Sequence, residues 1–171
     1  MRFLTAKPMI IAANVDERGL SETSHYLEET QKVAAEQGVE MVVLCAQLEQ
    51  EAQDMNPEER IEYLQLAGAA TTGLEQVIRK SFEMLHLISF FTFNQNEARA
   101  WNVSRGATAP KAAGAIHTDF ERGFIRAEVI PFDTFAKYGS SAAVKSVGLM
   151  RLEGKEYLVQ DGDVIYFRFN V

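Results

Sequence analysis

Apolar residues gather in short runs that alternate with helical stretches along the first part of the chain. Residues 8–13 (PMIIAA) and 40–44 (EMVVL) are such runs and predict buried strands. Residues 21–37 between them have helical periodicity, and Gly38 follows as a stop signal. The positions of this helix expected to face inward are Tyr26, Leu27, Val33 and Ala34. Because parallel neighbours need such a crossover, strand, helix and strand predict a parallel sheet.

Further helices are predicted at 47–55, 57–67 and 73–86, the second with Asn56 as N-cap and Pro57 at its first position. The pattern then changes. The remaining elements are strands at 87–93 and 97–103 joined by a turn at 94–96, a helix at 110–120, a strand at 124–130, short helices at 131–138 and 141–147, and strands at 157–160 and 164–171 around the turn 161–163. A hairpin, a crossing helix and further strands follow the β-grasp order seen in ubiquitin. We expect two domains, an α/β domain at 1–86 and an α+β domain at 87–171.

Charge is spread unevenly between these two parts. Residues 1–86 hold 7 Lys and Arg against 15 Asp and Glu, a net charge of −8, whereas residues 87–171 hold 10 against 9, a net charge of +1. An acidic surface repels nucleic acid, so any contact with RNA is expected in the second part.

Other features of the composition narrow the class of protein. Apolar residues make up 47% of the chain and charged residues 24%, which is typical of a globular protein. Cys45 is the one cysteine, so no internal disulfide is expected; the residue fits a reducing cytoplasm and a buried position at a strand end. No apolar run reaches the length of a membrane span and no export signal is readable, so we expect no membrane partner.

Two short segments at the ends of the predicted parallel strands are candidates for binding chemistry. Asn14-Val15-Asp16-Glu17 follows the first strand and Cys45-Ala46 follows the second. Ligands bind at the carboxyl ends of such strands. From spacing alone, however, the first segment is typical of a capped turn and the second carries no signal.

The signature of a phosphate-binding loop is missing. Such a loop needs G-x-x-x-x-G-K-[ST], with glycines for backbone approach, a lysine for the phosphates and a hydroxyl for magnesium. The nearest segment runs from Gly148 to Glu156; its glycines are one residue too far apart, and Glu156 stands where Ser or Thr is needed. A carboxylate repels phosphate there, so this segment is rejected. Glu49 and Glu51 are interpreted as solvated helix charges, and no catalytic residue is assigned.

Metal binding is not predicted either. On a helix, His117 and Glu121 share a face, but two ligands make a poor metal site. Trp101 and Phe120 are expected in the core. Arg105, Lys111, Arg122 and Arg126 are candidates for contact with RNA, and a normal mixed surface is the alternative interpretation of these basic residues.

Residues 106–130 (GATAPKAAGAIHTDFERGFIRAEVI) and 153–171 (EGKEYLVQDGDVIYFRFNV) resemble the C-terminal TGS domain of the YchF-type, Obg-like P-loop ATPases. Asn14 to Glu17 resembles the base-recognition loop of that family, with Val15 and Glu17 in place of the Lys and Asp of a strict guanine clamp. Cys45-Ala46 resembles the family's further nucleotide motif, in which a backbone N–H contacts the purine. The resemblance implies a partial P-loop G domain followed by a β-grasp, ubiquitin-like TGS domain.

The resemblance also implies a function. The family members bind and hydrolyse ATP, accept GTP, require Mg²⁺ and associate with ribosomes in the cytoplasm. Their phosphate loop and coiled-coil insertion precede the segment matched here, so this chain is expected to begin after them. We expect no hydrolysis and no tight binding of ATP or GTP by this chain alone. The alternative is a stand-alone TGS module that binds ribosomal or transfer RNA without nucleotide chemistry. A partial G domain leaves apolar surface exposed, so self-association is also expected.

Overall fold

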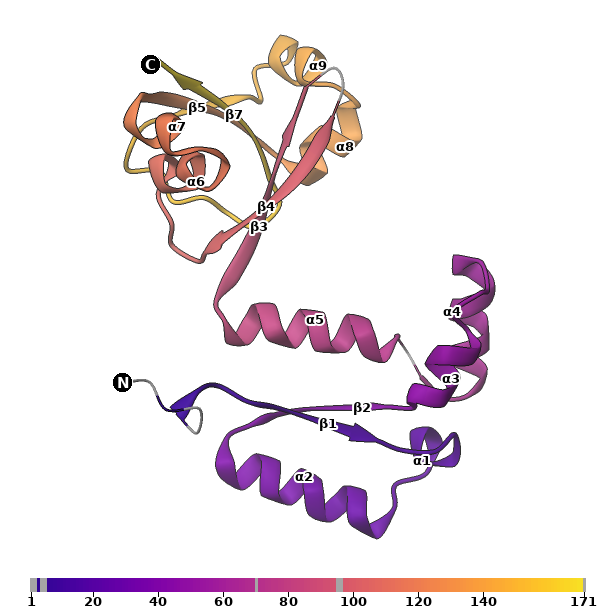
Figure 1. The fold of residues 1–171 in the computed structure, drawn as a ribbon. Helices are drawn as coiled ribbons and strands as arrows, with labels where there is room; N and C mark the ends of the chain where they lie inside the picture. The colour runs from indigo at the N-terminus through magenta and orange to yellow at the C-terminus, as the bar shows by residue number, and fades with distance from the viewer. Residues whose placement is uncertain (1–2, 4–5, 70, 95–96, 171) are drawn as a thin grey trace. The chain divides into compact units, whose positions relative to one another are not determined.

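The chain folds into two compact units, residues Met1–Leu85 and His86–Val171. A computed structural model describes residues 3, 6–69, 71–94 and 97–170 (Figure 1). Two predicted features reach beyond these residues: the turn at 94–96 includes Gln95 and Asn96, and the last strand includes Val171. Within the described part of the chain, no helix has the length and apolar character needed to cross a bilayer.

The first unit is built on two parallel strands with helices around them (Figure 1). Its elements are β1 (Ile10–Asn14), α1 (Arg18–Ser21), α2 (His25–Gln37), β2 (Glu40–Leu44), α3 (Ala46–Glu51), α4 (Pro57–Leu66) and α5 (Gly73–Met84). The strands pair from Ile10 opposite Glu40 to Asn14 opposite Leu44, as the strand–helix–strand pattern predicts. Their carboxyl ends therefore meet at one edge.

Helix α2 buries a narrower stripe than its periodicity predicts. Leu27 and Ala34 are buried, but Tyr26 is 83% exposed and Val33 is 45% exposed. A sheet of two strands offers a narrow face, so the helix covers it with one row of side chains. The helix also begins later than predicted, at His25, because Ser24 Oγ accepts a hydrogen bond from Leu27 N (3.2 Å) and caps it.

The predicted start of α4 is confirmed. Asn56 Oδ1 accepts a hydrogen bond from Glu59 N (2.9 Å), and Pro57 occupies the first helical position, where it needs no N–H partner. Helix α5 is capped in the same way by Thr72 Oγ1, which accepts from Glu75 N at 3.0 Å.

The second unit is a five-stranded sheet in the order β4-β3-β7-β5-β6. Its elements are β3 (Leu87–Phe93), β4 (Ala98–Ser104), α6 (Ala109–Ile116), α7 (Thr118–Arg122), β5 (Phe124–Pro131), α8 (Phe132–Tyr138), α9 (Ser141–Ser146), β6 (Arg151–Glu153) and β7 (Asp163–Phe169). The pair β3–β7 is parallel, and the pairs β3–β4, β5–β7 and β5–β6 are antiparallel.

Alternation along the strands gives this sheet two apolar faces. Ile88 and Phe90 of β3 belong to one cluster, which includes the fully buried alanines of α6, whereas Phe91 and Phe93 pack against the cluster on the other face. The first cluster is covered by α6, whose small side chains allow close approach to the sheet. The second contains Val144 of α9 and lies under α8 and α9.

Two predicted elements of this unit are wrong. The helix expected at 110–120 is broken at His117, whose extended backbone (φ −160°) ends α6 and whose Nδ1 accepts from Asp119 N to begin α7. The segment 157–160 is not a strand of the sheet; Leu158 forms a single bridge with Thr108 before α6. The short strand β6 pairs with β5 instead.

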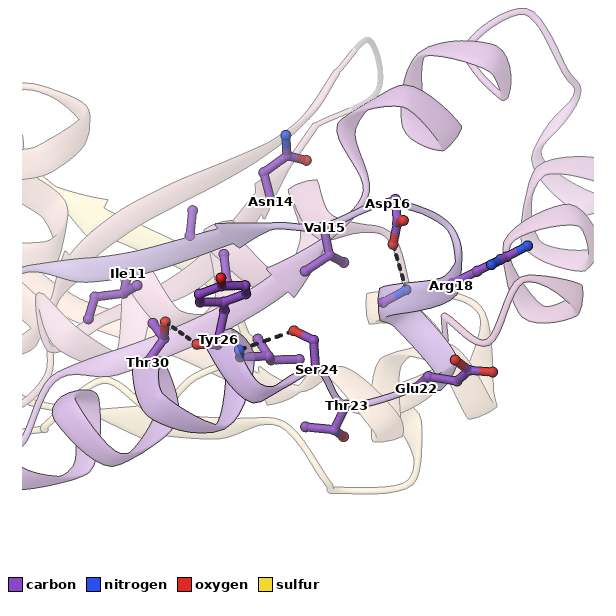
Figure 2. A pocket seen from close by; sticks show the side chains of 14 residues that line it. Ile11, Asn14, Val15, Asp16, Arg18, Glu22, Thr23, Ser24, Tyr26 and Thr30 are labelled. Atoms are coloured by element: carbon purple, nitrogen blue, oxygen red, sulfur yellow. Dashed lines mark hydrogen bonds between the residues drawn. The ribbon is translucent and has the colours of Figure 1, made fainter.

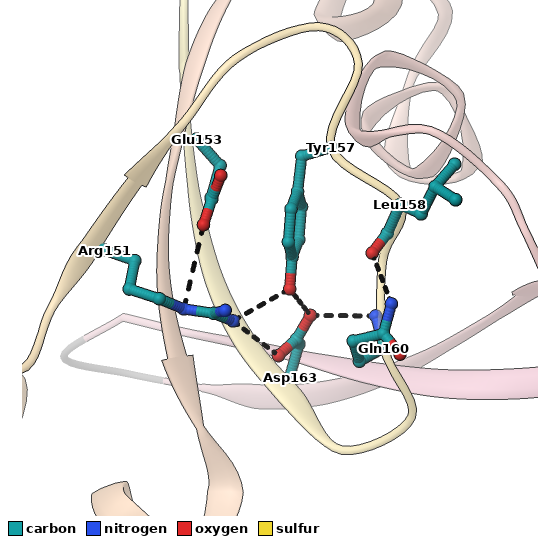
Figure 3. Close-up of polar contacts among 6 residues, drawn as sticks. All are labelled: Arg151, Glu153, Tyr157, Leu158, Gln160 and Asp163. Atoms are coloured by element: carbon teal, nitrogen blue, oxygen red, sulfur yellow. Dashed lines mark hydrogen bonds and ion pairs between the residues drawn. The ribbon is translucent and has the colours of Figure 1, made fainter.

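A polar network fixes the segment that leads into β7. Asp163 is 2% exposed, and its Oδ2 accepts hydrogen bonds from Tyr157 Oη (2.7 Å) and Gln160 N (2.9 Å). Arg151 Nη2 donates to Tyr157 Oη (2.9 Å) and lies 3.7 Å from Asp163 Oδ1 (Figure 3). Burial and the hydrogen bond to Asp163 raise the pKa of Tyr157 to about 12.

Candidate functional site

The two segments selected from the sequence meet at the carboxyl ends of β1 and β2. Asn14 ends β1, and its Oδ1 accepts a hydrogen bond from Ala46 N at 3.0 Å. Val15 N donates to Leu44 O at 2.9 Å, which extends the strand pairing by one residue. The structure therefore joins directly two segments that lie 32 residues apart in the sequence.

Asp16 and Glu17 form the tight turn that follows. Asp16 Oδ1 accepts a hydrogen bond from Gly19 N (2.9 Å) at the start of α1, a helix that the sequence pattern did not predict. A side chain at Gly19 would approach Val15 Cβ to 2.7 Å, so the turn depends on a glycine there. Both acidic side chains are exposed, and that of Glu17 makes no capping hydrogen bond.

Cys45 is buried, as its position predicts. It is 5% exposed and packs with Leu48 and Leu64. Its thiol therefore faces the core of the first unit. Ala46 is exposed, but its backbone N already donates to Asn14.

Tyr63 and Glu51 are additional polar residues near this edge. Tyr63 Oη donates to Glu51 Oε2 at 2.8 Å, and Gln47 Nε2 donates to Glu51 Oε1 at 3.0 Å. The hydrogen bond to Glu51 raises the pKa of Tyr63, and the charge of Glu17 contributes to the rise. The spacing of Gln47 and Glu51 on one helix face was visible in the sequence, but nothing in the pattern connected them with Tyr63.

Glu49 is not a solvated helix charge, contrary to expectation. It is half-buried, and its Oε1 accepts a hydrogen bond from Gly73 N at the start of α5. A carboxylate at a helix N-terminus is favoured by the helix dipole. A side chain at Gly73 would approach Leu44 Cβ to 2.6 Å, so this close packing also requires a glycine.

An open pocket of about 670 Å³ lies on the side of β1 that faces α2. Asn14, Val15 and Asp16 contribute to its lining together with Tyr26 of α2; Glu17 and the Cys45-Ala46 segment do not. Figure 2 shows Asn14 pointing away from Tyr26, across the strand. Asn14 therefore borders the pocket and also contacts Ala46, which is not part of the pocket lining.

The basic residues selected in the second unit are Arg105, Lys111, Arg122 and Arg126, and all of them are exposed. Lys111 forms an ion pair with Glu121. Among the described residues, the other three have no ion-pair partner.

The structure also describes the segments considered for phosphate and metal binding. The segment from Gly148 to Glu156 contains strand β6 and does not lead into a helix, unlike a phosphate loop. His117 lies between two helices and does not share a helical face with Glu121. Within the described part of the chain, no three His, Cys, Asp or Glu side chains are grouped so that they could hold a metal ion.

Comparison with known proteins indicates the family to which this chain is related. Residues 87–170 match the family model described as "YchF-GTPase_C: Protein of unknown function (DUF933)". The chain is 50% identical over 169 residues to a protein named ribosome-binding ATPase YchF from Haemophilus influenzae, a match that covers 99% of this chain and 46% of that protein. It is 46% identical over 171 residues to the protein of the same name from Escherichia coli O157:H7, covering 100% of this chain and 47% of that protein.

A solved structure agrees with the sequence matches. The structure of the Schizosaccharomyces pombe YchF GTPase superposes with a TM-score of 0.86 at 32% identity, covering 96% of this chain and 44% of that one. The chain thus spans about half the length of the curated relatives it matches. By the family model, the full-length similarity of this chain and the mixed α/β fold, the chain belongs to the YchF family.

Proposed function

We propose that this chain carries the purine-recognition loop and the ribosome-contacting domain of a P-loop nucleotide hydrolase. The observation that supports this best is the hydrogen bond between Asn14 and Ala46, which unites the two base-recognition segments. The relatives named ribosome-binding ATPase and the neighbour titled a GTPase support nucleotide binding in the intact protein. The ribosome association that we propose implies a cytoplasmic protein.

Purine recognition rests on the arrangement of the first unit, which we assign to the C-terminal portion of a G domain. Ala46 N holds Asn14 Oδ1, so the amide nitrogen of Asn14 is left to donate to a ring nitrogen of the purine. The exposed carboxylate of Glu17 stands where a strict guanine clamp has Asp, and Val15 stands where it has Lys, so the guanine clamp is altered. This supports acceptance of ATP as well as GTP.

The described part of this chain offers no comparable binding residues for the phosphates or for Mg²⁺. Bound Mg²⁺ would neutralise charge on the transferring phosphoryl group, with a phosphate-loop lysine beside it. The sequence contains no phosphate loop, and the described residues offer no grouped metal ligands. We therefore propose that this chain alone neither binds ATP or GTP tightly nor hydrolyses it.

The second unit is assigned to a β-grasp, ubiquitin-like TGS domain. A hairpin, helix α6 across one face and a central β7 parallel to β3 are consistent with that fold. We propose that it contacts ribosomal or transfer RNA through Arg105, Lys111, Arg122 and Arg126. The alternative is an RNA- or ribosome-binding module without nucleotide chemistry.

Self-association is a further property that we propose for the first unit. Tyr26 is 83% exposed and Leu74 is 65% exposed. Strand β1 pairs with β2 on one side only among the described residues, and an unpaired strand edge is a template for association.

Sedimentation of the chain with purified ribosomes over a series of salt concentrations tests the ribosome assignment. Phosphate contacts release counterions, so binding should weaken steeply as salt rises. Replacing Arg122 and Arg126 with Gln should lower the salt slope by about 1 for each lost contact. Lys32→Gln, which removes one positive charge from the acidic first unit, should leave the slope unchanged. Failure to sediment even at low salt would count against the proposal.

A further inference from the structure

A second pocket, of about 440 Å³, opens on the face of the five-stranded sheet that α6 covers, at the point where α6 ends. Its walls include Thr92, Arg99, Trp101, Ile116, Phe120 and Phe169. Its size lies within the range of small-molecule sites, which is about 300–1,000 Å³. None of the four basic residues proposed to contact RNA lines it, so it is a distinct feature of the second unit.

The sheet and the break between α6 and α7 together create this pocket. Thr92 of β3, Trp101 of β4 and Phe167 of β7 point to the face that α6 covers. Because α6 ends at Ile116, it leaves the far end of this face uncovered. Helix α7 then brings Phe120 to the pocket wall.

Aromatic rings with accessible surface dominate the wall. Phe120 and Phe169 are stacked, with ring centroids 3.8 Å apart and planes inclined by 25°. Phe169 is 37% exposed, so the pair is not closed off by the core. Trp101 is half-buried, and its Nε1 donates to Thr92 Oγ1 at 2.9 Å, which fixes the orientation of the indole ring.

The rim carries a positioned cation. The Arg99 guanidinium lies 5.8 Å from the centroid of the Trp101 ring and is held by Glu97, with Nε to Oε1 at 2.6 Å. Glu97 offsets the charge of Arg99, so the rim is a poor site for a free anion. A ligand with both a flat ring and a phosphate fits this combination better than a phosphate alone.

We propose that this pocket binds an unpaired base of single-stranded RNA, which stacks on Trp101 and Phe169 while Arg99 meets the adjacent phosphate. Aromatic faces beside an arginine are the usual means of holding splayed-out bases. With a net charge of +1, this half of the chain does not repel RNA as the other half does with its net charge of −8. The inference rests on the proposed RNA contact of the second unit and assigns it a base-reading position.

The chain supplies its own reporter, because Trp101 is its one tryptophan. The full 171-residue chain is titrated at low salt with a single-stranded RNA of mixed sequence, about eight nucleotides long, within the usual range of single-strand sites. We expect saturable quenching of Trp101 fluorescence, with the same Kd as anisotropy of the labelled RNA. A duplex of the same length, whose bases are already stacked, should leave Trp101 emission unchanged.

Two substitutions of Phe169 distinguish the contribution of ring stacking from that of apolar volume. Phe169→Leu keeps apolar volume but removes the aromatic face, and should weaken binding about tenfold. Phe169→Tyr keeps the ring and should bind as the wild type does; equal urea midpoints for the two variants exclude a folding defect.

If RNA binds but leaves Trp101 emission unchanged and is unaffected by Phe169→Leu, the pocket does not bind a base. The proposed RNA contact through the basic residues would then still hold. No RNA binding at low salt overturns both.

Discussion

We predict that the buried carboxylate of Asp163 stabilises the fold of the second unit. The perturbation is Asp163→Asn, which keeps the size of the side chain but removes its charge. In the native structure this side chain is 3% exposed and accepts hydrogen bonds from Tyr157 Oη (2.7 Å) and Gln160 N (2.9 Å), with Arg151 3.7 Å away. The replacement therefore removes the charge that two hydrogen-bond donors and one cation contact.

The magnitude follows from these contacts. A hydrogen bond to a charged group contributes about 1.5–3 kcal/mol and a neutral one about 0.5–1.5 kcal/mol, so neutralising one acceptor shared by two donors costs about 2 kcal/mol. Arg151 is 45% exposed, so its attraction to Asp163 is screened and adds about 0–1 kcal/mol. We expect Asp163→Asn to lower the free energy of unfolding by about 2–3 kcal/mol.

Urea unfolding followed by Trp101 fluorescence measures this directly, because the one tryptophan lies in the same unit. Glu156→Gln, the same charge change at an exposed position in the segment that leads into β7, is the matched control and should change stability by less than about 0.5 kcal/mol. Tyr157→Phe combined with Asp163→Asn should destabilise less than the sum of the two single changes. Unfolding of Asp163→Asn at the wild-type midpoint would show that the carboxylate does not stabilise this unit.

Three further predictions concern other contacts. Gly123→Ala places a Cβ 1.9 Å from the backbone carbonyl that follows β7, so it should cost about 1–3 kcal/mol in urea unfolding, whereas Gly154→Ala, with open space around it, should be near neutral. The pKa of Tyr157 is about 12 in the folded chain and about 10 when unfolded, so its contribution to stability is complete below pH 10 and falls towards pH 12; Tyr157→Phe should flatten this decline in alkaline urea titrations. Asn14→Ala should speed hydrogen exchange at Ala46 N about three- to tenfold by NMR, and unchanged exchange would show that their hydrogen bond does not form.

The sequence predicted correctly those helices and strands whose pattern depends on residues only a few positions apart. The apolar runs at β1 and β2 and the N-cap Asn56 are examples, because each depends on its own neighbours. The break at His117 was missed because a histidine with extended backbone between two helical turns has no strong sequence signature. The exposure of Tyr26 was missed because periodicity identifies an apolar face but not the width of the sheet that covers it.

The candidate site was predictable to a similar degree. Position after a strand was enough to select Asn14 and Ala46, since the carboxyl ends of parallel strands meet. Their hydrogen bond fulfils that geometric expectation. The partnership of Glu51 with Tyr63 depends on how α3 and α4 pack, which no local pattern encodes.

A titration of this chain with fluorescent ATP and GTP in the presence of Mg²⁺ tests directly whether the chain has a phosphate site. A few hydrogen bonds to a purine do not offset the entropy lost on association, so without a phosphate site binding should not saturate below about 1 mM. Saturable binding with a Kd of about 10 μM would show that this chain has a phosphate site, because affinity of that order requires phosphate contacts.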